Sequence, residues 1–516
     1  MHKNRILWAD DEIDLLKPHI LFLEDKGYEI IAVKSGVDAL DKVDETSFDL
    51  VFLDENMPGM SGLETLTAIK AKFPSLPVVM ITKSEEEHIM EEAIGSKIAD
   101  YLIKPLNPNQ ILMSAKKLLD NERLITEKTN QDYRQEFTNL SDALGADLTA
   151  NEWAELYRKL VFWELSIDQT EEKSMREILE MQKTEANQKF TRFLTGNYED
   201  WMNGDDHAPM LSHQVLDKKV FPLVENDPVF LIVIDNLRYD QWEILEPEIL
   251  KFFELEEKEY YYSILPTTTS YARNALFAGL TPLEISEKMP AYWVGEDTDD
   301  PKNNFEKELL DANLKDKGIA GKMSYHKIIK AKDGKSLVEN VSALFDNDIN
   351  AIVYNFVDML SHARTDMHMI RELAPDESAY RSLTKSWFSH SSLNDLLKEL
   401  SARKVKVVIT TDHGTVRVNN PEKIVGDRTT NTNLRFKQGR NLDFDEKKVY
   451  FTRNPDSIGL PKLNVSTAYA FACQDAYFVY PNNYNHYVNH YRDTFQHGGI
   501  SMEEIIVPLI TLKSKS

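Results

Sequence analysis

The chain of 516 residues carries 60 basic and 85 acidic residues, and its net charge of −25 argues against broad electrostatic binding to duplex DNA. Its single cysteine excludes a disulfide framework and a zinc site built from several thiolates. The apolar runs have the length of strands, and the N-terminus does not have the pattern of a signal peptide. We therefore expect a cytoplasmic protein of about three domains that makes no membrane contact.

Residues 1–120 alternate short apolar segments with segments of helical period. We predict strands at 5–9, 28–33, 50–54, 77–82 and 100–104, each followed by a helix. Parallel strands need crossover helices, so this rhythm predicts a five-stranded, doubly wound α/β domain. In such a sheet the functional residues lie at the carboxyl ends of the strands.

Three carboxylates fall at those strand ends: Asp10, Asp11 and Asp54. Carboxylates so close together cannot all stay ionised without a cation, which predicts a Mg²⁺ site. Asp54 is placed to accept a phosphoryl group, and Lys104 and the Thr82 hydroxyl are placed to receive its oxygens.

These residues resemble the receiver domain of two-component response regulators. The matching motifs are ADDE at 9–12, LDENMPGMSG at 53–62, the threonine that ends the fourth strand, and KP at 104–105. The resemblance implies that Asp54 is the phosphorylation site and that Asp11, Asp54 and the Asn56 carbonyl hold Mg²⁺. It further implies that Tyr101 is the aromatic switch residue and that Lys104–Pro105 is a cis peptide. A sensor histidine kinase is the expected partner, and phosphorylation is expected to favour a homodimer through the face around Tyr101.

Residues 121–205 are rich in helix formers and poor in proline and glycine, and their apolar residues recur at intervals of three and four. This pattern predicts an amphipathic helical bundle that connects two domains. Because no basic recognition helix stands out in it, we expect the segment to carry the receiver's state onward rather than to bind DNA.

From residue 206 to 516 the alternation of strands and helices returns, and metal-ligand residues follow several of the apolar strands. They are Asp235, Asp358 with His362, Asp412 with His413, and His497. Asp358 and His362 lie one helical turn apart and can face one cation. Asp412 and His413 lie at a tight strand-end turn, where their side chains can converge. Three aspartates and three histidines suit two metal ions with about three protein ligands each.

A threonine-rich turn, PTTTS at 266–270, follows another strand and precedes a helix. A hydroxyl at the start of that helix would meet a phosphate where amide donors and the helix dipole favour an anion. A metal ion beside it would lower its pKa and activate it as a nucleophile.

The ligand set and the threonine turn together resemble the alkaline phosphatase superfamily, specifically its PglZ branch. The resemblance implies an alkaline-phosphatase-like α/β domain over 206–516 with two Zn²⁺ ions; Mn²⁺ is the alternative because all ligands are N and O donors. It assigns one ion to Asp358, His362 and His497, and the other to Asp235, Asp412 and His413. Related nucleotide phosphodiesterases use the second threonine of Pro-Thr-x-Thr as nucleophile, with a glycine ten residues later. Thr269 and Gly279 fit that spacing, and Thr268 is the alternative.

Segment 415–440 holds six basic and two acidic residues, and tyrosines are frequent after it. Cations near a phosphoryl site with aromatic faces beyond suit a nucleotide or short oligonucleotide, and Arg428 and Arg435 are the substrate-binding candidates. The alternative is that the loop is only solvated and that the tyrosines pack strands.

The whole arrangement resembles a group of atypical response regulators linked to type IX secretion and gliding in Bacteroidetes. It implies that phosphorylation of the receiver controls a zinc-dependent phosphodiesterase output. Two other functions stay open: a regulatory adaptor that binds a partner such as a sigma factor without turnover, and a phosphomutase.

Overall fold

The structure is a computed structural model that describes residues 4–74, 76–83, 98–170, 173–224, 227–295, 302–427, 430–445 and 448–515. It divides into two compact units, the first formed by 1–134 with 169–172 and the second by 135–168 with 173–516. No helix within the described ranges combines the length and the apolar character needed to cross a bilayer.

The first unit contains a five-stranded parallel sheet in the order β2-β1-β3-β4-β5. Its strands are β1 (Arg5–Ala9), β2 (Glu29–Val33), β3 (Leu50–Asp54), β4 (Val78–Thr82) and β5 (Asp100–Ile103). The described helices are α1 (Lys17–Asp25), α2 (Gly36–Glu45), α3 (Gly62–Lys72) and α5 (Pro108–Ala115). Alternate residues of β1 enter different cores: Ile6 and Trp8 pack toward α1 and α5, and Leu7 and Ala9 toward α2 and α3. The predicted doubly wound fold is confirmed.

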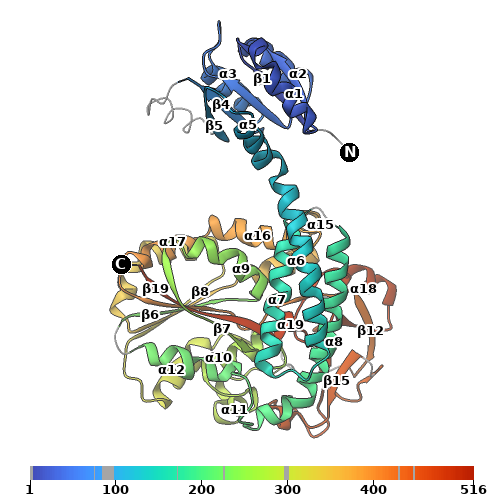
Figure 1. Ribbon diagram of the computed structural model, residues 1–516. Helices are drawn as coiled ribbons and strands as arrows, with labels where there is room; N and C mark the ends of the chain where they lie inside the picture. The colour runs from blue at the N-terminus through green and yellow to red at the C-terminus, as the bar shows by residue number, and fades with distance from the viewer. Residues whose placement is uncertain are drawn as a thin grey trace. The chain divides into compact units, whose positions relative to one another are not determined.

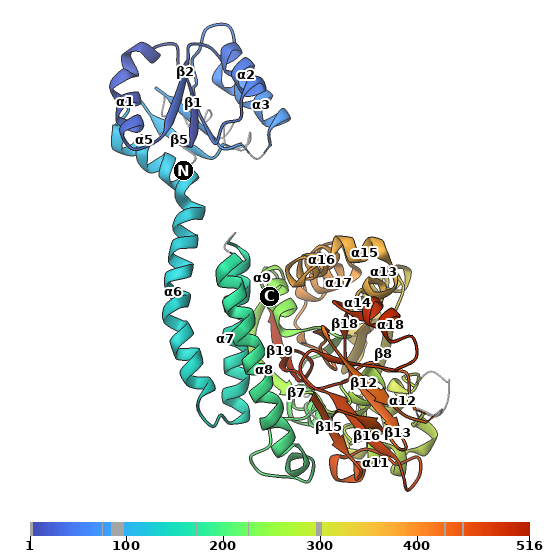
Figure 2. The same cartoon turned by 90° about the vertical axis from the view of Figure 1, so that its right-hand side faces the viewer.

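Three long helices follow: α6 (Asn121–Leu144), α7 (Ala150–Asp168) and α8 (Lys173–Met202). The predicted helical connector is therefore present. Helices α7 and α8 belong to the second unit, where they lie side by side against the rest of that unit (Figure 1, Figure 2). Trp153 of α7 packs on Phe190 of α8, with ring centroids 5.6 Å apart.

The second unit is built around a six-stranded sheet in the order β7-β19-β10-β6-β9-β8. Its strands are β6 (Val229–Ile234), β7 (Phe253–Tyr262), β8 (Met323–Ile328), β9 (Ile349–Tyr354), β10 (Lys406–Thr410) and β19 (Ile506–Ser514). Strands β10, β6, β9 and β8 are parallel, whereas β19 runs antiparallel to both β10 and β7.

Helices cover both faces of this sheet, as Figure 1 shows. One face carries α9 (Tyr239–Ile249), α13 (Ala331–Glu339), α16 (Glu377–Ser389) and α17 (Ser392–Ser401), and the other carries α10 (Asn274–Ala278), α11 (Pro282–Lys288) and α12 (Glu306–Asp316). Strand β6 is buried on both sides: Phe230, Ile232 and Ile234 face the first core, and Val229, Leu231 and Val233 the second. A strand buried on both sides explains the unbroken apolar run VFLIVI.

The remaining elements lie between β9 and β19 in the chain. They are α14 (Phe356–Asp366), α15 (His368–Leu373), β11 (Val416–Arg417), β12 (Asn420–Val425), β13 (Phe436–Gly439), β14 (Asp443–Phe444), β15 (Val449–Thr452), β16 (Ala468–Ala472), β17 (Ala476–Val479), α18 (Tyr484–Tyr491), β18 (Phe495–Gln496) and α19 (Met502–Ile505). The short strands form three small sheets: β11-β18, β14-β12-β17 and β13-β16-β15. These sheets lie together at one side of the unit (Figure 2).

Candidate phosphorylation site and two-metal site

The carboxyl edge of the receiver sheet gathers charged groups around Asp54. The Lys104 ammonium lies 2.7 Å from Asp54 Oδ1 and 2.9 Å from Asp10 Oδ2. Burial raises the pKa of Asp54, and the neighbouring Asp10 charge adds to the rise while Lys104 opposes it. The pKa of Lys104 is raised, because its bonds to the two carboxylates outweigh the effect of burial. One ligand atom each from Asp10, Asp11 and Asp54 lie within 4.8 Å of one another, so the donor set fits a hard divalent cation.

The other receiver residues predicted from the sequence lie around this edge. Thr82 is buried at the end of β4, and its hydroxyl donates a hydrogen bond to the Glu55 carboxylate. Tyr101 is half-buried on β5, and Asn56 is exposed in the loop after β3. The Lys104–Pro105 peptide is cis. The roles assigned to Thr82, Tyr101 and Asn56 stay predictions.

Three adjacent parallel strands of the large sheet deliver the aspartates of the predicted metal sites to one edge. Asp235 follows β6, Asp412 follows β10, and Asp358 lies in the first turn of α14 after β9. The three histidines reach the same edge, His362 from α14, His413 from the turn after β10 and His497 from the loop after β18. The parallel order of β10, β6 and β9 makes these residues neighbours despite their distance along the chain.

The first group consists of Asp358, His362 and His497, whose ligand atoms lie within 4.8 Å of one another. Asp358 reaches both imidazoles: His362 Nε2 lies 3.6 Å from its Oδ2, and His497 Nε2 lies 3.6 Å from its Oδ1. Burial, reinforced by the charge of Asp235, raises the pKa of Asp358 to about 6. Burial also holds the pKa of His497 well below its ordinary value, so this imidazole is neutral and free to bind a metal.

The second group consists of Asp235, Asp412 and His413, all buried and within the same 4.8 Å. His413 Nε2 lies 3.6 Å from Asp412 Oδ2 and 4.0 Å from Asp235 Oδ1. Asp412 Oδ2 is buried without a hydrogen-bond donor. Burial raises the pKa of Asp235, and the nearby Asp412 charge adds to the rise. A buried carboxylate oxygen without a hydrogen-bond partner, as at Asp412, fits a nearby cation.

Hydrogen bonds outside the site turn two imidazoles toward it. His413 Nδ1 lies 3.0 Å from the Gly414 carbonyl, and His497 Nδ1 lies 3.2 Å from the Thr267 carbonyl. A carbonyl accepts from a protonated Nδ1, and in both rings this contact directs Nε2 to the carboxylates. Such outer hydrogen bonds orient metal-binding histidines in proteins. The residues present therefore fit divalent metal ions at both groups.

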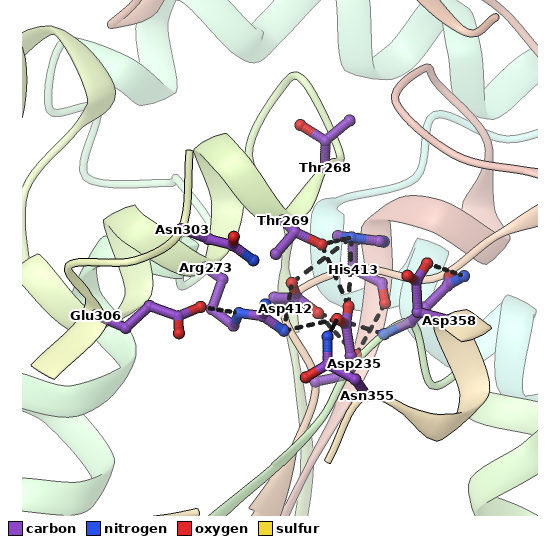
Figure 3. Close-up of polar contacts among 12 residues, drawn as sticks. Asp235, Thr268, Thr269, Arg273, Asn303, Glu306, Asn355, Asp358, Asp412 and His413 are labelled. Atoms are coloured by element: carbon purple, nitrogen blue, oxygen red, sulfur yellow. Dashed lines mark hydrogen bonds and ion pairs between the residues drawn. The ribbon is translucent and has the colours of Figure 1, made fainter. Parts of the chain in front are cut away.

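The three threonines of the turn have different surroundings, and only Thr269 faces the second metal group (Figure 3). Its Oγ1 lies 3.3 Å from Asp235 Oδ1 and 3.3 Å from His413 Nε2. Thr268 contacts Ser270 Oγ at 3.3 Å instead. Thr267 is buried and donates to the Gly499 carbonyl at 3.0 Å. The geometry favours Thr269 as the reactive hydroxyl, at the first position of a single π-helical turn, Thr269–Arg273.

A buried cation, Arg273, completes the second group and was missed by the sequence reasoning. Its Nη1 lies 2.8 Å from Asp235 Oδ2, and its Nε donates to Glu306 Oε1 at 2.6 Å. Asn355 donates to the same Asp235 oxygen at 2.8 Å. The outer oxygen of Asp235 is thus held by a hydrogen bond from Asn355 and an ion pair with Arg273, while the inner oxygen faces Thr269 and His413, as Figure 3 shows. The spacing of Arg273 four residues after Thr269 was the available sequence signal.

The proposed substrate-binding role of Arg435 is wrong. Arg435 is fully buried, and its Nη2 donates to Glu504 Oε2 at 2.6 Å. The guanidinium therefore bonds to buried groups of the protein itself and does not reach a ligand. Lys437, from the same segment, is also buried, and its Nζ donates to the Asn431 carbonyl at 2.9 Å. The second candidate, Arg428, lies outside the described residues.

The tyrosines beyond that segment divide into buried and exposed groups. Tyr469 and Tyr477 are fully buried, and their hydroxyls donate to the carbonyls of Pro461 and Val488. On α18, Tyr487 is exposed and its ring stacks on that of Tyr491 at 6.1 Å. The alternative that the tyrosines pack strands therefore holds for the first two.

Comparison with known proteins agrees with this architecture. Residues 6–116 match the response regulator receiver domain, residues 123–202 match the PorX response regulator linker domain, and residues 215–512 match the BREX system PglZ alkaline phosphatase-like domain. Curated relatives include the transcriptional regulatory protein ZraR of Klebsiella oxytoca, 34% identical over 27% of this chain and 31% of that protein. ResD of Bacillus subtilis is 31% identical over 23% of this chain and 49% of that protein.

The chain thus spans less than half the length of these two relatives. Among solved structures, chemotaxis protein CheY4 of Vibrio cholerae is 28% identical over 23% of this chain and all of that chain, with a TM-score of 0.22. A receiver domain implies a phosphodonor such as a sensor kinase. Because the PglZ match extends over more than half of the residues, the chain belongs to the PglZ family of alkaline phosphatase-like domains, here preceded by a response regulator receiver domain and its PorX-type linker.

Proposed function

We propose that this protein is a response regulator in which phosphorylation of Asp54 controls a metal-dependent phosphodiesterase. The observation that carries the proposal is the position of the Thr269 hydroxyl, 3.3 Å from both Asp235 Oδ1 and His413 Nε2. A nucleophile that lies among metal ligands serves phosphoryl transfer, whereas an adaptor without turnover has no need of it. The substrate class we propose is a nucleotide or short oligonucleotide.

The reaction follows from the groups present. The Thr269 oxygen attacks phosphorus, a bond between oxygen and phosphorus forms, and the bond to the alcohol leaving group breaks. The proton of the Thr269 hydroxyl ends on the leaving alcohol. Water then cleaves the bond between the Thr269 oxygen and phosphorus, which releases the phosphomonoester and restores the hydroxyl. Divalent ions bound by the two groups would lower the pKa of the hydroxyl and offset the charge of the phosphoryl oxygens. We propose Zn²⁺ for these sites, with Mn²⁺ as the alternative, and Mg²⁺ for the receiver.

Two features support a diester substrate and a regulatory input. The Pro266, Thr267, Thr269 and Gly279 spacing is that of nucleotide phosphodiesterases, which the sequence resembles. In the receiver, Met113 on α5 is 71% exposed beside Tyr101 and Ile103 of β5, and we propose this face for a phosphorylation-dependent homodimer. The link to type IX secretion and gliding rests on the resemblance of the three-part architecture.

A direct assay tests the proposal. Purified full-length protein is incubated with a bis-aryl phosphodiester and with the matching aryl monoester, with and without EDTA. We expect hydrolysis of the diester that EDTA abolishes and zinc restores, and slower turnover of the monoester. A metal-loaded protein that hydrolyses neither ester would leave the adaptor as the better reading, and net transfer of phosphate between two hydroxyls would indicate the phosphomutase.

A further inference from the structure

Helix α8 presents two buried polar side chains to the catalytic domain. Asn187 and Tyr198 are 8% and 1% exposed, and their separation of eleven positions corresponds to about three turns, which puts both on one helix face. The Tyr198 hydroxyl accepts a hydrogen bond from the Leu265 backbone N–H at 2.8 Å. The Asn187 carbonyl oxygen accepts one from the Met502 N–H, also at 2.8 Å.

The two backbone segments held by α8 lead directly to reactive residues. Leu265 lies four residues before Thr269, and Met502 lies five residues after His497. Both segments are buried, so the N–H groups of Leu265 and Met502 have these side chains in place of water. We call residues 497–501, between β18 and α19, the histidine loop. Helix α8 therefore holds the threonine turn at one end and the histidine loop at its junction with α19.

The threonine turn and the histidine loop are also joined to each other. Thr267 Oγ1 accepts from the Gly498 N–H at 2.9 Å and donates to the Gly499 carbonyl at 3.0 Å. His497 Nδ1 lies 3.2 Å from the Thr267 carbonyl. The distance between the reactive hydroxyl and His497 therefore depends on the placement of both segments.

A second contact ties Asn187 to the end of the histidine loop. Its amide nitrogen lies 3.0 Å from Glu503 Oε2. One turn earlier on α8, Lys183 pairs with Glu164 of α7 at 2.7 Å, and Glu164 pairs with Arg381 of α16 at 2.7 Å. These buried charges fasten α8 to α7 and to the catalytic domain, so α8 is a fixed support for the two segments.

We propose that Asn187 and Tyr198 are positioning residues of the active site, through which the connector helix α8 sets the placement of His497 and Thr269. The inference rests on the proposed function for its kinetic part only. Misplacement of a reacting group by about 1 Å costs roughly 100-fold in rate, so a loop released from α8 has a measurable effect even though α8 touches no reacting atom.

Two variants of the full-length protein separate the two contacts. Tyr198→Phe removes one hydroxyl beside the threonine turn, and we expect kcat on the bis-aryl diester to fall roughly tenfold while KM and both zinc affinities stay within about twofold. Asn187→Leu releases the histidine loop, and we expect zinc affinity at the Asp358–His362–His497 site to fall roughly tenfold, as for other outer contacts of metal ligands. Affinity at the Asp235–Asp412–His413 site should stay within about twofold.

The matched control is Thr195→Val on the same helix, because the Thr195 hydroxyl bonds only to carbonyls of its own helix, at 2.9 Å and 3.3 Å. Zinc affinities are measured by competition with a chromogenic chelator, and folding by the thermal midpoint of the metal-free proteins. If Asn187→Leu does not fold, Asn187→Ser, too short to reach Met502, takes its place.

Each outcome decides the proposal. Unchanged kcat in Tyr198→Phe, or equal zinc losses at both sites in the Asn187 variant, overturns it, and so does a Thr195→Val variant with the same losses. If the wild-type protein hydrolyses no diester, the proposed function fails. In that case the selective zinc loss still supports the positioning role of Asn187, and its absence refutes it.

Discussion

The Thr269 hydroxyl oxygen lies 3.3 Å from His413 Nε2, the nitrogen that the Gly414 carbonyl leaves free for a metal ion. The proposed nucleophile and one proposed ligand of the second metal group are thus neighbours in the folded chain. Thr268, adjacent in the chain, directs its hydroxyl to Ser270 instead. Because the two hydroxyls have different partners, substitution of each threonine can test which of them is the nucleophile.

Thr269→Val should retain both metals and lose diester turnover by about a thousandfold or more, because the covalent route disappears. Thr268→Val, of the same size change, should stay within about tenfold of wild type. Rates on a bis-aryl diester and the metal content of each variant provide the measurement. Full activity in Thr269→Val together with a large loss in Thr268→Val would reverse the assignment.

Histidine variants should separate the two metal groups. His362→Ala and His497→Ala each remove a ligand from the same group, so both should leave about one ion per chain, and the double variant should lose no further ion. His413→Ala should empty the other group. Elemental analysis after metal-replete expression measures the stoichiometry, and exposed His390, on α16's C-terminal side, provides the control variant. Loss of both ions in every variant would mean that the groups form one site.

Zinc affinity at the Asp358 group should depend on pH. Burial and the charge of Asp235 raise the pKa of Asp358 to about 6, and only the ionised carboxylate binds a metal. Affinity should therefore increase as pH rises toward about 6 and level off above it. Chelator competition between about pH 5 and 7.5 measures this, and Asp358→Asn should remove the transition near the raised pKa.

The raised pKa of Asp358 has the opposite pH dependence in the metal-free protein, where it favours the folded state at low pH. Because the folded pKa of Asp358 lies above its ordinary value of 3.8, its contribution to stability is fully present below that value. The contribution is lost as pH rises through about 6. Chemical denaturation of the metal-free protein should show this trend, and Asp358→Asn should weaken it.

In the receiver, Asp54→Ala should abolish labelling by a small phosphodonor in the presence of Mg²⁺. Asp54 is the buried carboxylate beside Lys104, with Asp10 and Asp11 near enough to share a cation. Asp44→Ala is the control, since Asp44 is exposed and pairs with Lys72. EDTA should prevent labelling of the wild type. Stoichiometric label on Asp54→Ala would refute the assignment, and unchanged sedimentation after phosphorylation would refute only the proposed dimer.

Arg435→Ala should destabilise the fold rather than weaken substrate binding selectively. Removing Arg435 leaves Glu504 buried without its partner, which costs about 3–5 kcal/mol in the free energy of unfolding. Arg440→Ala, an exposed position in the same segment, should change it by less than about 0.5 kcal/mol. Denaturant titration measures both. An Arg435 variant of normal stability that loses only oligonucleotide binding would restore the original interpretation.

Sequence patterns predicted the receiver strands to within a residue, and they predicted that the proposed metal-ligand residues gather at one edge of the large sheet. These predictions succeed because an apolar run fixes a strand, and parallel strands bring their carboxyl ends together. The chemistry-bearing residues then follow from their place after the run, as Asp235 does after β6.

Other features could not be predicted, because they depend on contacts between distant segments. Arg273 belongs to the second metal group because the fold places its guanidinium between Asp235 and Glu306, which are distant from it in the sequence. Arg435 was predicted to bind substrate because it lies in a net basic segment, whereas its buried partner Glu504 is far along the chain. The domain boundary drawn at residue 205 stays a prediction, although α8 packs within the same unit as the six-stranded sheet.

The position of β19 in the large sheet has a consequence for the order in which the two sheets can form during translation. Strand β19 lies between β7 and β10, and Phe253 at one end of β7 pairs with Ser514. Until β19 has been synthesised, β7 has no partner on this side and the sheet is divided. The receiver sheet is complete long before that point in translation. A nascent chain can therefore possess a complete receiver sheet while the large sheet of the PglZ domain is still open.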